Sequence, residues 1–175
     1  MTKKQRNIVL AVASVSIVAA LLLMLYYYFV TNVEQSVIDM YKWKYFTLDE
    51  LTKSKTAEQN GIDNTPSEEE KDNLTALVLK ILDPLREAYG HPITVNSAYR
   101  SKELNKLVGG ASSSQHLQGQ AADLTTGTKE GNKAIFYLLK SMNNYDQLIN
   151  ENDYSWVHVS YKRIGYNRKQ VLNIS

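Results

Sequence analysis

The sequence contains no cysteine, and only three histidines and three prolines among its 175 residues. A chain without cysteine forms no disulfide and offers no thiolate to a metal ion. Any metal site must therefore be built from imidazole and carboxylate groups, with His91, His116 and His158 as the only imidazoles. The lack of cysteine is compatible with either side of a membrane, so it does not decide the compartment.

A strong excess of charge is also missing from most of the chain. The formal net charge is +2, and Lys3, Lys4 and Arg6 supply three positive charges, which leaves the remainder at −1. Domains that bind nucleic acid carry a strongly basic face. We therefore expect no nucleic-acid partner, and we expect a monomer.

One long apolar run is present near the N-terminus. Residues 8–30 contain no charged side chain, and about 20 apolar residues in a helix cross the hydrocarbon core of a bilayer. The basic residues before the run predict a cytoplasmic N-terminus. A cleaved signal peptide is the alternative, but its apolar core is shorter, and this run ends in the aromatic residues 26–29, which are typical of a membrane interface.

The expected organisation follows from this run. It comprises a cytoplasmic tail at 1–7, a transmembrane anchor at 8–30, a linker at 31–45 and a folded domain at 46–175. The localisation expected for the protein is a single-pass membrane protein with its folded domain in the periplasm or otherwise outside the cytoplasm.

Helix signals dominate the first part of the folded domain. The polar segment 53–64 is interpreted as a loop, and Thr65-Pro66-Ser67-Glu68 resembles a capping box with proline at the first helical position. Leucine, isoleucine and valine then recur at helical spacing as far as Gly90. Pro84 lies inside this helix and is expected to kink it.

Short strands are expected later in the chain. We predict strands at 93–96, 121–125, 147–149, 156–160 and 170–173, and further helices at 101–108 and 132–142. Because helices come first and strands cluster later, the fold class is α+β with a small, largely antiparallel sheet.

Two histidines lie in settings that suit a metal site. His116 lies in a polar loop, Gly119 permits a tight reversal, and a short apolar strand brings Asp123 back seven residues later. His158 lies on a strand between two valines. Catalytic zinc commonly takes three such ligands and keeps a fourth position open for water. The spacing alone leaves a second interpretation open, because a histidine in a strand is more often a hydrogen-bonded core residue.

The surrounding residues carry a resemblance to a known family. Ser114 to Asp123 matches the pattern Ser-x-His-x-x-Gly-x-Ala-x-Asp at every fixed position, and Trp156-Val157-His158 matches a second pattern, Trp-x-His. Together with the block around Tyr99-Arg100-Ser101, these motifs resemble the zinc D-Ala-D-Ala carboxypeptidases and murein peptidases, in particular the small branch of phages and Bacteroidetes. The resemblance extends from about Tyr45 to the C-terminus.

This resemblance implies a fold, a cofactor and ligands. The implied fold is the compact α+β fold that these peptidases share with the hedgehog domain, and the implied cofactor is Zn²⁺ on His116, Asp123 and His158. Arg100 matches the family arginine that holds substrate or stabilises the developing oxyanion. A structural salt bridge is the alternative role for this side chain.

The general base departs from the family pattern. Relatives often carry a carboxylate three residues before the last histidine, where this chain has Ser155. Glu151 and Asp153 are the available acids, and Glu151 is preferred because it follows the Gln-Leu-Ile strand as in the small phage-like members. Either acid can instead be a solvated loop charge.

Four further residues are candidates for substrate binding. Ser114 and Gln115 flank the metal loop, where the alternative role is structural support of the loop. Tyr99 and Trp156 are candidates to line a substrate groove, and packing in the core is the alternative for both.

The predicted function is zinc-dependent hydrolysis of a peptide bond in bacterial peptidoglycan. The alternatives are a D-Ala-D-Ala dipeptidase or carboxypeptidase and a non-catalytic wall-binding module on the same fold. The sequence leaves open a phage lysis enzyme (endolysin), a virion-associated enzyme and a cellular enzyme of wall remodelling. It also leaves open which peptide bond is cut.

Overall fold

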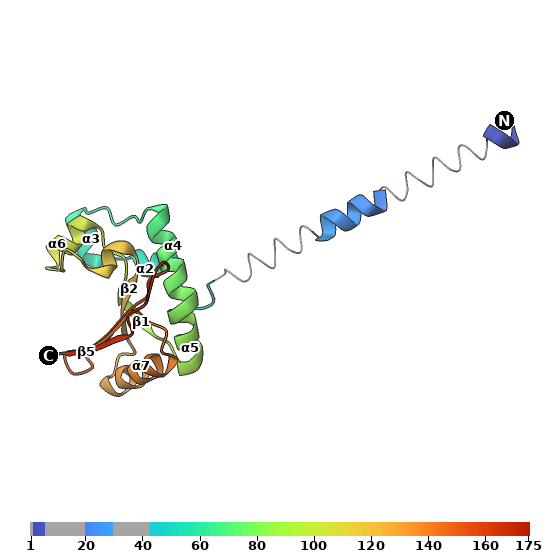
Figure 1. Cartoon of the computed structure of the whole chain (residues 1–175). Coiled ribbons are helices and arrows are strands. Elements are labelled where there is room, and N and C mark those ends of the chain that lie inside the picture. Colours follow the sequence, from blue (N-terminus) through green and yellow to red (C-terminus); the bar gives the residue numbers. More distant parts are fainter. Residues whose placement is uncertain (1, 6–19, 30–42) are drawn as a thin grey trace. The chain divides into compact units, whose positions relative to one another are not determined.

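The computed structural model describes residues 2–5, 20–29 and 43–175, and the chain divides into two units, Met1–Lys42 and Trp43–Ser175 (Figure 1). In the first unit residues 3–5 and 20–29 are helical. Most of the expected anchor at 8–30, and the linker as far as residue 42, lie outside the described residues. In the part of the chain that is described, no helix is both long enough and apolar enough to span a bilayer.

The second unit contains most of its helices in its first half. They are α2 (Leu48–Thr52), α3 (Lys55–Asn60), α4 (Glu68–Leu77), η1 (Val78–Leu82), α5 (Asp83–Tyr89), α6 (Lys102–Leu107), η2 (Gln115–Gln118) and α7 (Lys129–Met142).

Two predictions about these helices were wrong. The segment 53–64 is not a loop, because Ser54 caps the N-terminus of α3 and Gly61 ends it in the left-handed conformation. Helix α4 begins two residues later than the sequence suggested. Its capping box pairs Ser67 with Glu70, and the two residues exchange side chain-to-backbone hydrogen bonds.

Pro84 is accommodated by a widened turn of helix. The π-helical segment η1 joins α4 to α5, and Pro84 lies just after it. Proline has no N–H to donate and its ring crowds the carbonyl four residues earlier, which here belongs to Lys80. Asn144 donates to this Lys80 carbonyl over 3.3 Å. The helix therefore continues past the proline with that acceptor satisfied from outside.

The sheet has five strands in the order β1-β2-β4-β3-β5. The strands are β1 (Thr94–Ser97), β2 (Ala121–Thr125), β3 (Gln147–Glu151), β4 (Trp156–Ser160) and β5 (Gln170–Ile174). All neighbouring pairs are antiparallel except β3 with β5, which is parallel. This mixture of helices and a small, largely antiparallel sheet confirms the α+β class.

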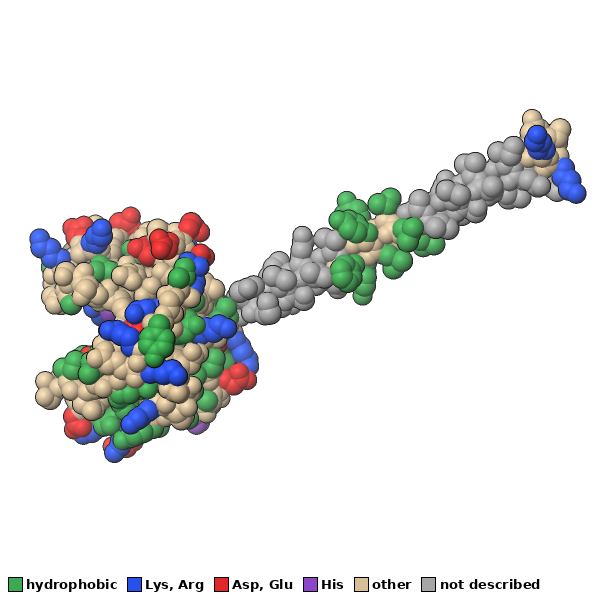
Figure 2. All heavy atoms as spheres, viewed as in Figure 1, with side chains coloured by type: hydrophobic (Ala, Val, Ile, Leu, Met, Phe, Trp, Pro, Cys, Tyr) green, Lys and Arg blue, Asp and Glu red, His purple; other side chains and the backbone are tan. Residues whose placement is uncertain are grey.

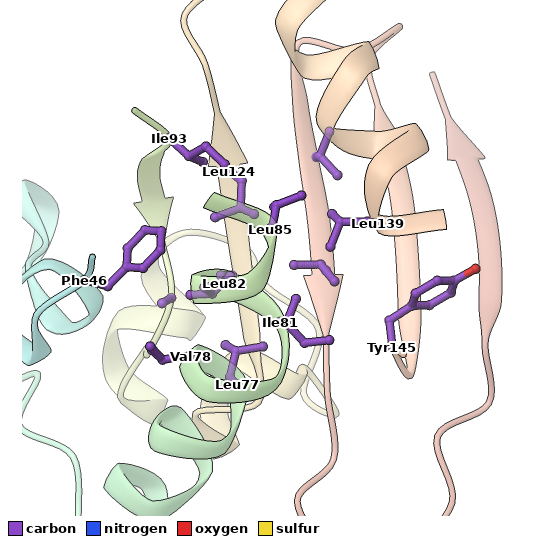
Figure 3. Close-up of a cluster of buried hydrophobic side chains, with 14 of the residues drawn as sticks. Phe46, Leu77, Val78, Ile81, Leu82, Leu85, Ile93, Leu124, Leu139 and Tyr145 are labelled. Carbon is purple, nitrogen blue, oxygen red and sulfur yellow. The ribbon is translucent and has the colours of Figure 1, made fainter. Parts of the chain in front are cut away.

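The two faces of the sheet have different roles because successive side chains of a strand alternate in direction. Leu124, Val157 and Val159 are fully buried on one face, against the leucine-rich helices. Figure 3 shows Leu85 and Leu139 directed into this core. Residues of the opposite parity, such as Asp123 and His158, lie on the other face. The hydrophobic core therefore fixes the strands from behind and leaves the second face for polar chemistry.

Candidate metal centre

His116 is held by the short helix η2 and by the backbone before α6. Ser114 caps η2 by accepting a hydrogen bond from the His116 N–H, and Gly119 ends it in the left-handed conformation. The His116 Nδ1 lies 2.6 Å from the carbonyl oxygen of Ala98. A carbonyl only accepts, so Nδ1 carries the proton and Nε2 is left as a lone-pair donor.

Asp123 and His158 are brought together by strand pairing. They are direct partners on the antiparallel strands β2 and β4. Side chains of directly opposed residues project to the same face of the sheet. Two residues separated by 35 positions in the sequence thus become neighbours because β2 pairs with β4 in this register.

The three donor atoms have the separations that tetrahedral zinc requires. The His116 Nε2 lies 3.3 Å from the His158 Nδ1, and the Asp123 Oδ1 lies 3.3 Å from the first and 2.9 Å from the second. Ligands about 2.0–2.1 Å from a tetrahedral ion stand about 3.3 Å from one another. Two imidazoles and one carboxylate also form a donor set typical of catalytic zinc. The residues present therefore fit Zn²⁺.

Arg100 holds the outer oxygen of the ligand carboxylate. Its Nη2 donates to Asp123 Oδ2 over 2.7 Å, and its Nε donates to Ser97 Oγ over 2.8 Å. Burial by itself would raise the pKa of Asp123, but hydrogen bonds with His116 and His158 outweigh it and hold the pKa well below its usual range. Asp123 is consequently a carboxylate, as metal binding requires.

The metal donors open into a pocket of about 490 Å³. Its wall includes the expected residues Arg100, Ser114, Gln115, Glu151 and Trp156 besides the three metal donors. A cavity of this size accommodates a short stretch of peptide.

Glu151 lies in this pocket, and Asp153 does not. Glu151 is the last residue of β3 and pairs with Trp156 on β4, two residues before His158. Burial raises the pKa of Glu151, and this outweighs the opposing effect of His158. Asp153 forms an ion pair with Lys129 and lines a different cavity. Of the two acids that the sequence offered as general base, only Glu151 therefore has access to the metal donors.

The turn after β3 explains this separation. Residues Asn152, Asp153 and Tyr154 all have left-handed backbone conformations. The amide of buried Asn132 donates to the carbonyls of Tyr154 and Ser155 and so fixes the turn. The chain reverses sharply after Glu151, which leaves that carboxylate on the metal face and carries Asp153 away.

The sequence of the second unit matches a known family. Residues 44–160 match the model of the family described as Peptidase M15. The chain belongs to the Peptidase M15 family. A protein named zinc D-Ala-D-Ala carboxypeptidase, from Streptomyces albus G, is 51% identical over 49 residues, which are 27% of this chain. The matched residues span 19% of the length of that relative.

The other expected residues of this Peptidase M15 domain divide between pocket and core. Gln115 lines the pocket, and its Nε2 is buried without a hydrogen-bond partner among the described residues. Ser114 and Trp156 also lie on the pocket wall. Tyr99 is 7% exposed, belongs to the hydrophobic core, and is not part of the pocket wall. Burial is the larger cause, and the nearby Glu70 the second, of a rise in the pKa of Tyr99 to about 12.

Sequence reasoning missed three polar residues of the pocket wall, which are Ser113, Gln147 and Arg168. Gln147 was detectable, because it has the same parity as Glu151 on one strand and so faces the same side. Arg168 gave no signal in the sequence. It comes from the connection between β4 and β5, beyond the segment that matches the family.

Proposed function

We propose that this member of the Peptidase M15 family is a zinc-dependent peptidase that hydrolyses peptide bonds of bacterial peptidoglycan. The observation that carries the proposal is that Glu151 shares one pocket with His116, Asp123 and His158. Zinc bound there supplies a Lewis acid that activates water and polarises a peptide carbonyl. The family match and the name of the Streptomyces relative support both the metal and the class of substrate.

Glu151 acts as the general base of this reaction. A general base must lie within reach of the proton that it takes, and its pKa must be close to the working pH. Its place on the pocket wall with the metal donors supports the first condition. Burial raises the pKa of its carboxyl and so moves that pKa toward the working pH, as the second condition requires.

Arg100 orients the reacting groups, and Gln115 lies beside it on the pocket wall. Arg100 lines the pocket while one of its nitrogens is bound to Asp123, so it keeps the ligand carboxylate oriented and presents positive charge to the substrate. Gln115 lines the pocket beside the metal donors, and its buried Nε2 has no hydrogen-bond partner among the described residues. The fixed positive charge of Arg100 stabilises the charge that develops on a peptide oxygen.

The peptidase unit acts outside the cytoplasm in this proposal. Support comes from the sequence, in which the uncharged segment 8–30 follows Lys3, Lys4 and Arg6. Peptidoglycan lies beyond the cytoplasmic membrane, so an anchor of this orientation would hold the peptidase unit beside its substrate.

The test is digestion of purified peptidoglycan by the full-length protein with one equivalent of zinc. Mass spectrometry of the products identifies the bond that is cut, and release of free D-alanine distinguishes a carboxypeptidase from an endopeptidase. His116→Ala is the metal-site control. If the zinc-loaded protein leaves the wall and its soluble peptides intact, while His116→Ala still sediments with the wall, the chain is a binding module and the proposal is wrong.

A further inference from the structure

Arg168 is a cationic residue of the pocket wall to which the proposed reaction assigns no role. It belongs to the connection between β4, which ends at Ser160, and β5, which begins at Gln170. The family match ends at residue 160. The Arg168 side chain therefore lines the pocket of the metal donors, although it comes from a part of the chain outside the matched segment.

A buried carboxylate anchors this arginine. The Asp146 side chain is fully buried, and Arg168 contacts both of its oxygens, with Nε 3.1 Å from Oδ1 and 3.0 Å from Oδ2. The Arg168 backbone N–H also donates to Oδ1 over 3.0 Å. The side-chain nitrogens Nε and Nη2, together with the backbone N–H, fix the guanidinium in one orientation.

The anchoring leaves positive charge in excess. Lys162 also contacts the Asp146 carboxylate, with Nζ 3.1 Å from Oδ1. One negative charge thus faces two positive charges. Lys162 does not line the pocket, whereas Arg168 does. The uncompensated charge is therefore presented to the pocket through Arg168.

Part of the guanidinium is available to a ligand. Arginine has five N–H donors, and Asp146 engages only Nε and Nη2. Within residues 43–175 the Nη1 nitrogen makes no hydrogen bond to protein, and the side chain is 47% exposed. The free edge of the planar group can bind a carboxylate with two parallel hydrogen bonds.

The position of Arg168 sets its distance from the reacting bond. Gln147, Ile149 and Glu151 line the pocket along β3. Ile149 is level with His158, and Gln147 pairs with Gln170 at the opposite end of the strand from Glu151. Four residue steps along a strand span about 13 Å. The pocket thus has Glu151 at one end and Arg168 near the other. Because Gln147 is two residues from Ile149, Arg168 lies about two residues of extended peptide away from the metal donors.

We propose that Arg168 is a specificity-determining residue that binds a carboxylate of the substrate about two residues away from the scissile bond. This inference rests on the proposed function and narrows its substrate to anionic peptides. A wall peptide in which a γ-linked glutamate keeps its α-carboxylate free has the required chemistry.

Two synthetic peptides test the proposal on the zinc-loaded full-length protein. They share one scissile bond and differ only in the glutamate α-carboxyl, which is free in one peptide and amidated in the other. We expect the KM of wild type to be about tenfold lower for the free acid, since a hydrogen-bonded charge pair at a half-exposed site contributes about that factor. Arg168→Gln removes the difference between the peptides. Lys162→Gln reduces the difference but does not remove it, because the excess charge of the Asp146 cluster is lost while the free edge of the Arg168 guanidinium stays on the pocket wall.

The comparison between the two peptides in wild type does not depend on the folding of any variant. Equal KM values for both peptides in wild type overturn the proposal, even when both peptides are cut. Equal loss of discrimination in Lys162→Gln and Arg168→Gln also overturns it. Titration calorimetry tests the anion site at Arg168 independently of peptide cleavage, and so separates this inference from the proposed function. If neither peptide is cut, a tenfold difference in Kd that disappears in Arg168→Gln supports the anion site and shows that the peptidase assignment is the part that fails.

Discussion

Arg100 binds one oxygen of the Asp123 carboxylate over 2.7 Å, while the other oxygen of the same group faces both His116 and His158. One carboxylate oxygen thus binds the Arg100 cation, and the other is left to bind a metal ion together with the two histidines. An outer partner of this kind keeps the ligand charged and fixes its orientation. Arg100 therefore acts on the metal site through Asp123, in addition to any contact with substrate.

Substitution of Arg100 is expected to weaken zinc binding. Arg100→Gln removes the cation that orients Asp123, and loss of such a partner typically lowers metal affinity about 10–100-fold. Competition with a chromogenic chelator measures this without an activity assay. The control is Arg86→Gln, because Arg86 stacks on the ring of Tyr45 on another part of the unit. Unchanged zinc affinity in Arg100→Gln would contradict this role.

Replacement of Glu151, the proposed general base, is expected to lower turnover strongly but not zinc binding. Glu151→Gln removes the proton acceptor, and general-base catalysis typically contributes about 10²–10⁴-fold. Steady-state kinetics should show this loss in kcat with the zinc stoichiometry of wild type. Asp153→Asn should keep wild-type kcat because Asp153 lines a different cavity. The assignment is wrong if the two variants lose the same activity.

The Asp146 cluster is expected to make stability depend on pH in the acidic range. Burial alone would raise the pKa of Asp146, but hydrogen bonds from Arg168 and Lys162 outweigh it and lower the pKa to about 2 from an ordinary 3.8. A lowered folded-state pKa stabilises the protein above the unfolded pKa, and this stability is lost as the pH falls through the folded pKa. The expected loss is about 2 kcal/mol between pH 5 and pH 2.

Urea unfolding at both pH values measures that loss. In Asp146→Asn the contribution is absent at both pH values, so the free energy of unfolding should fall less steeply with acid than in wild type. Other carboxylates titrate equally in both proteins, and the difference between the two pH dependences isolates Asp146. Identical pH dependences would refute the contribution of the cluster.

Two glycines with the same backbone conformation provide a matched test of the metal loop. Gly119 and Gly61 both have φ of +64°. A Cβ on Gly61 meets nothing within 4 Å, whereas a Cβ on Gly119 would lie 2.6 Å from the Glu70 carbonyl oxygen. Gly61→Ala should cost about 1 kcal/mol of stability from left-handed strain alone. Gly119→Ala should cost at least about 1 kcal/mol more.

Zinc affinity provides a second measurement on the same pair. Gly119 donates its N–H to the His116 carbonyl, so a displaced loop moves a metal ligand. Only Gly119→Ala should lose zinc affinity. Equal stability in the two variants would show that α4 yields to the added methyl group at no cost.

Local patterns in the sequence predicted several elements correctly. The segments 121–125 and 156–160 are strands with the bounds that were expected, because apolar residues alternate or cluster there over five positions. The prediction failed at α3, where the segment is polar and its helical state depends on the caps Ser54 and Gly61. It also failed to anticipate η1, because a π-helical turn has no pattern of its own in the sequence.

The sequence by itself predicted the candidate metal ligands, since His116, Asp123 and His158 lie in short motifs that resemble those of the zinc peptidases. Only the tertiary structure decided which acid accompanies them. Asp153 lies nearer to His158 in the sequence, but a left-handed turn directs it away, while pairing of β3 with β4 places Glu151 on the metal face. The same reason applies to Arg168, because contacts across strands depend on register and on buried partners such as Asp146, which no local pattern encodes.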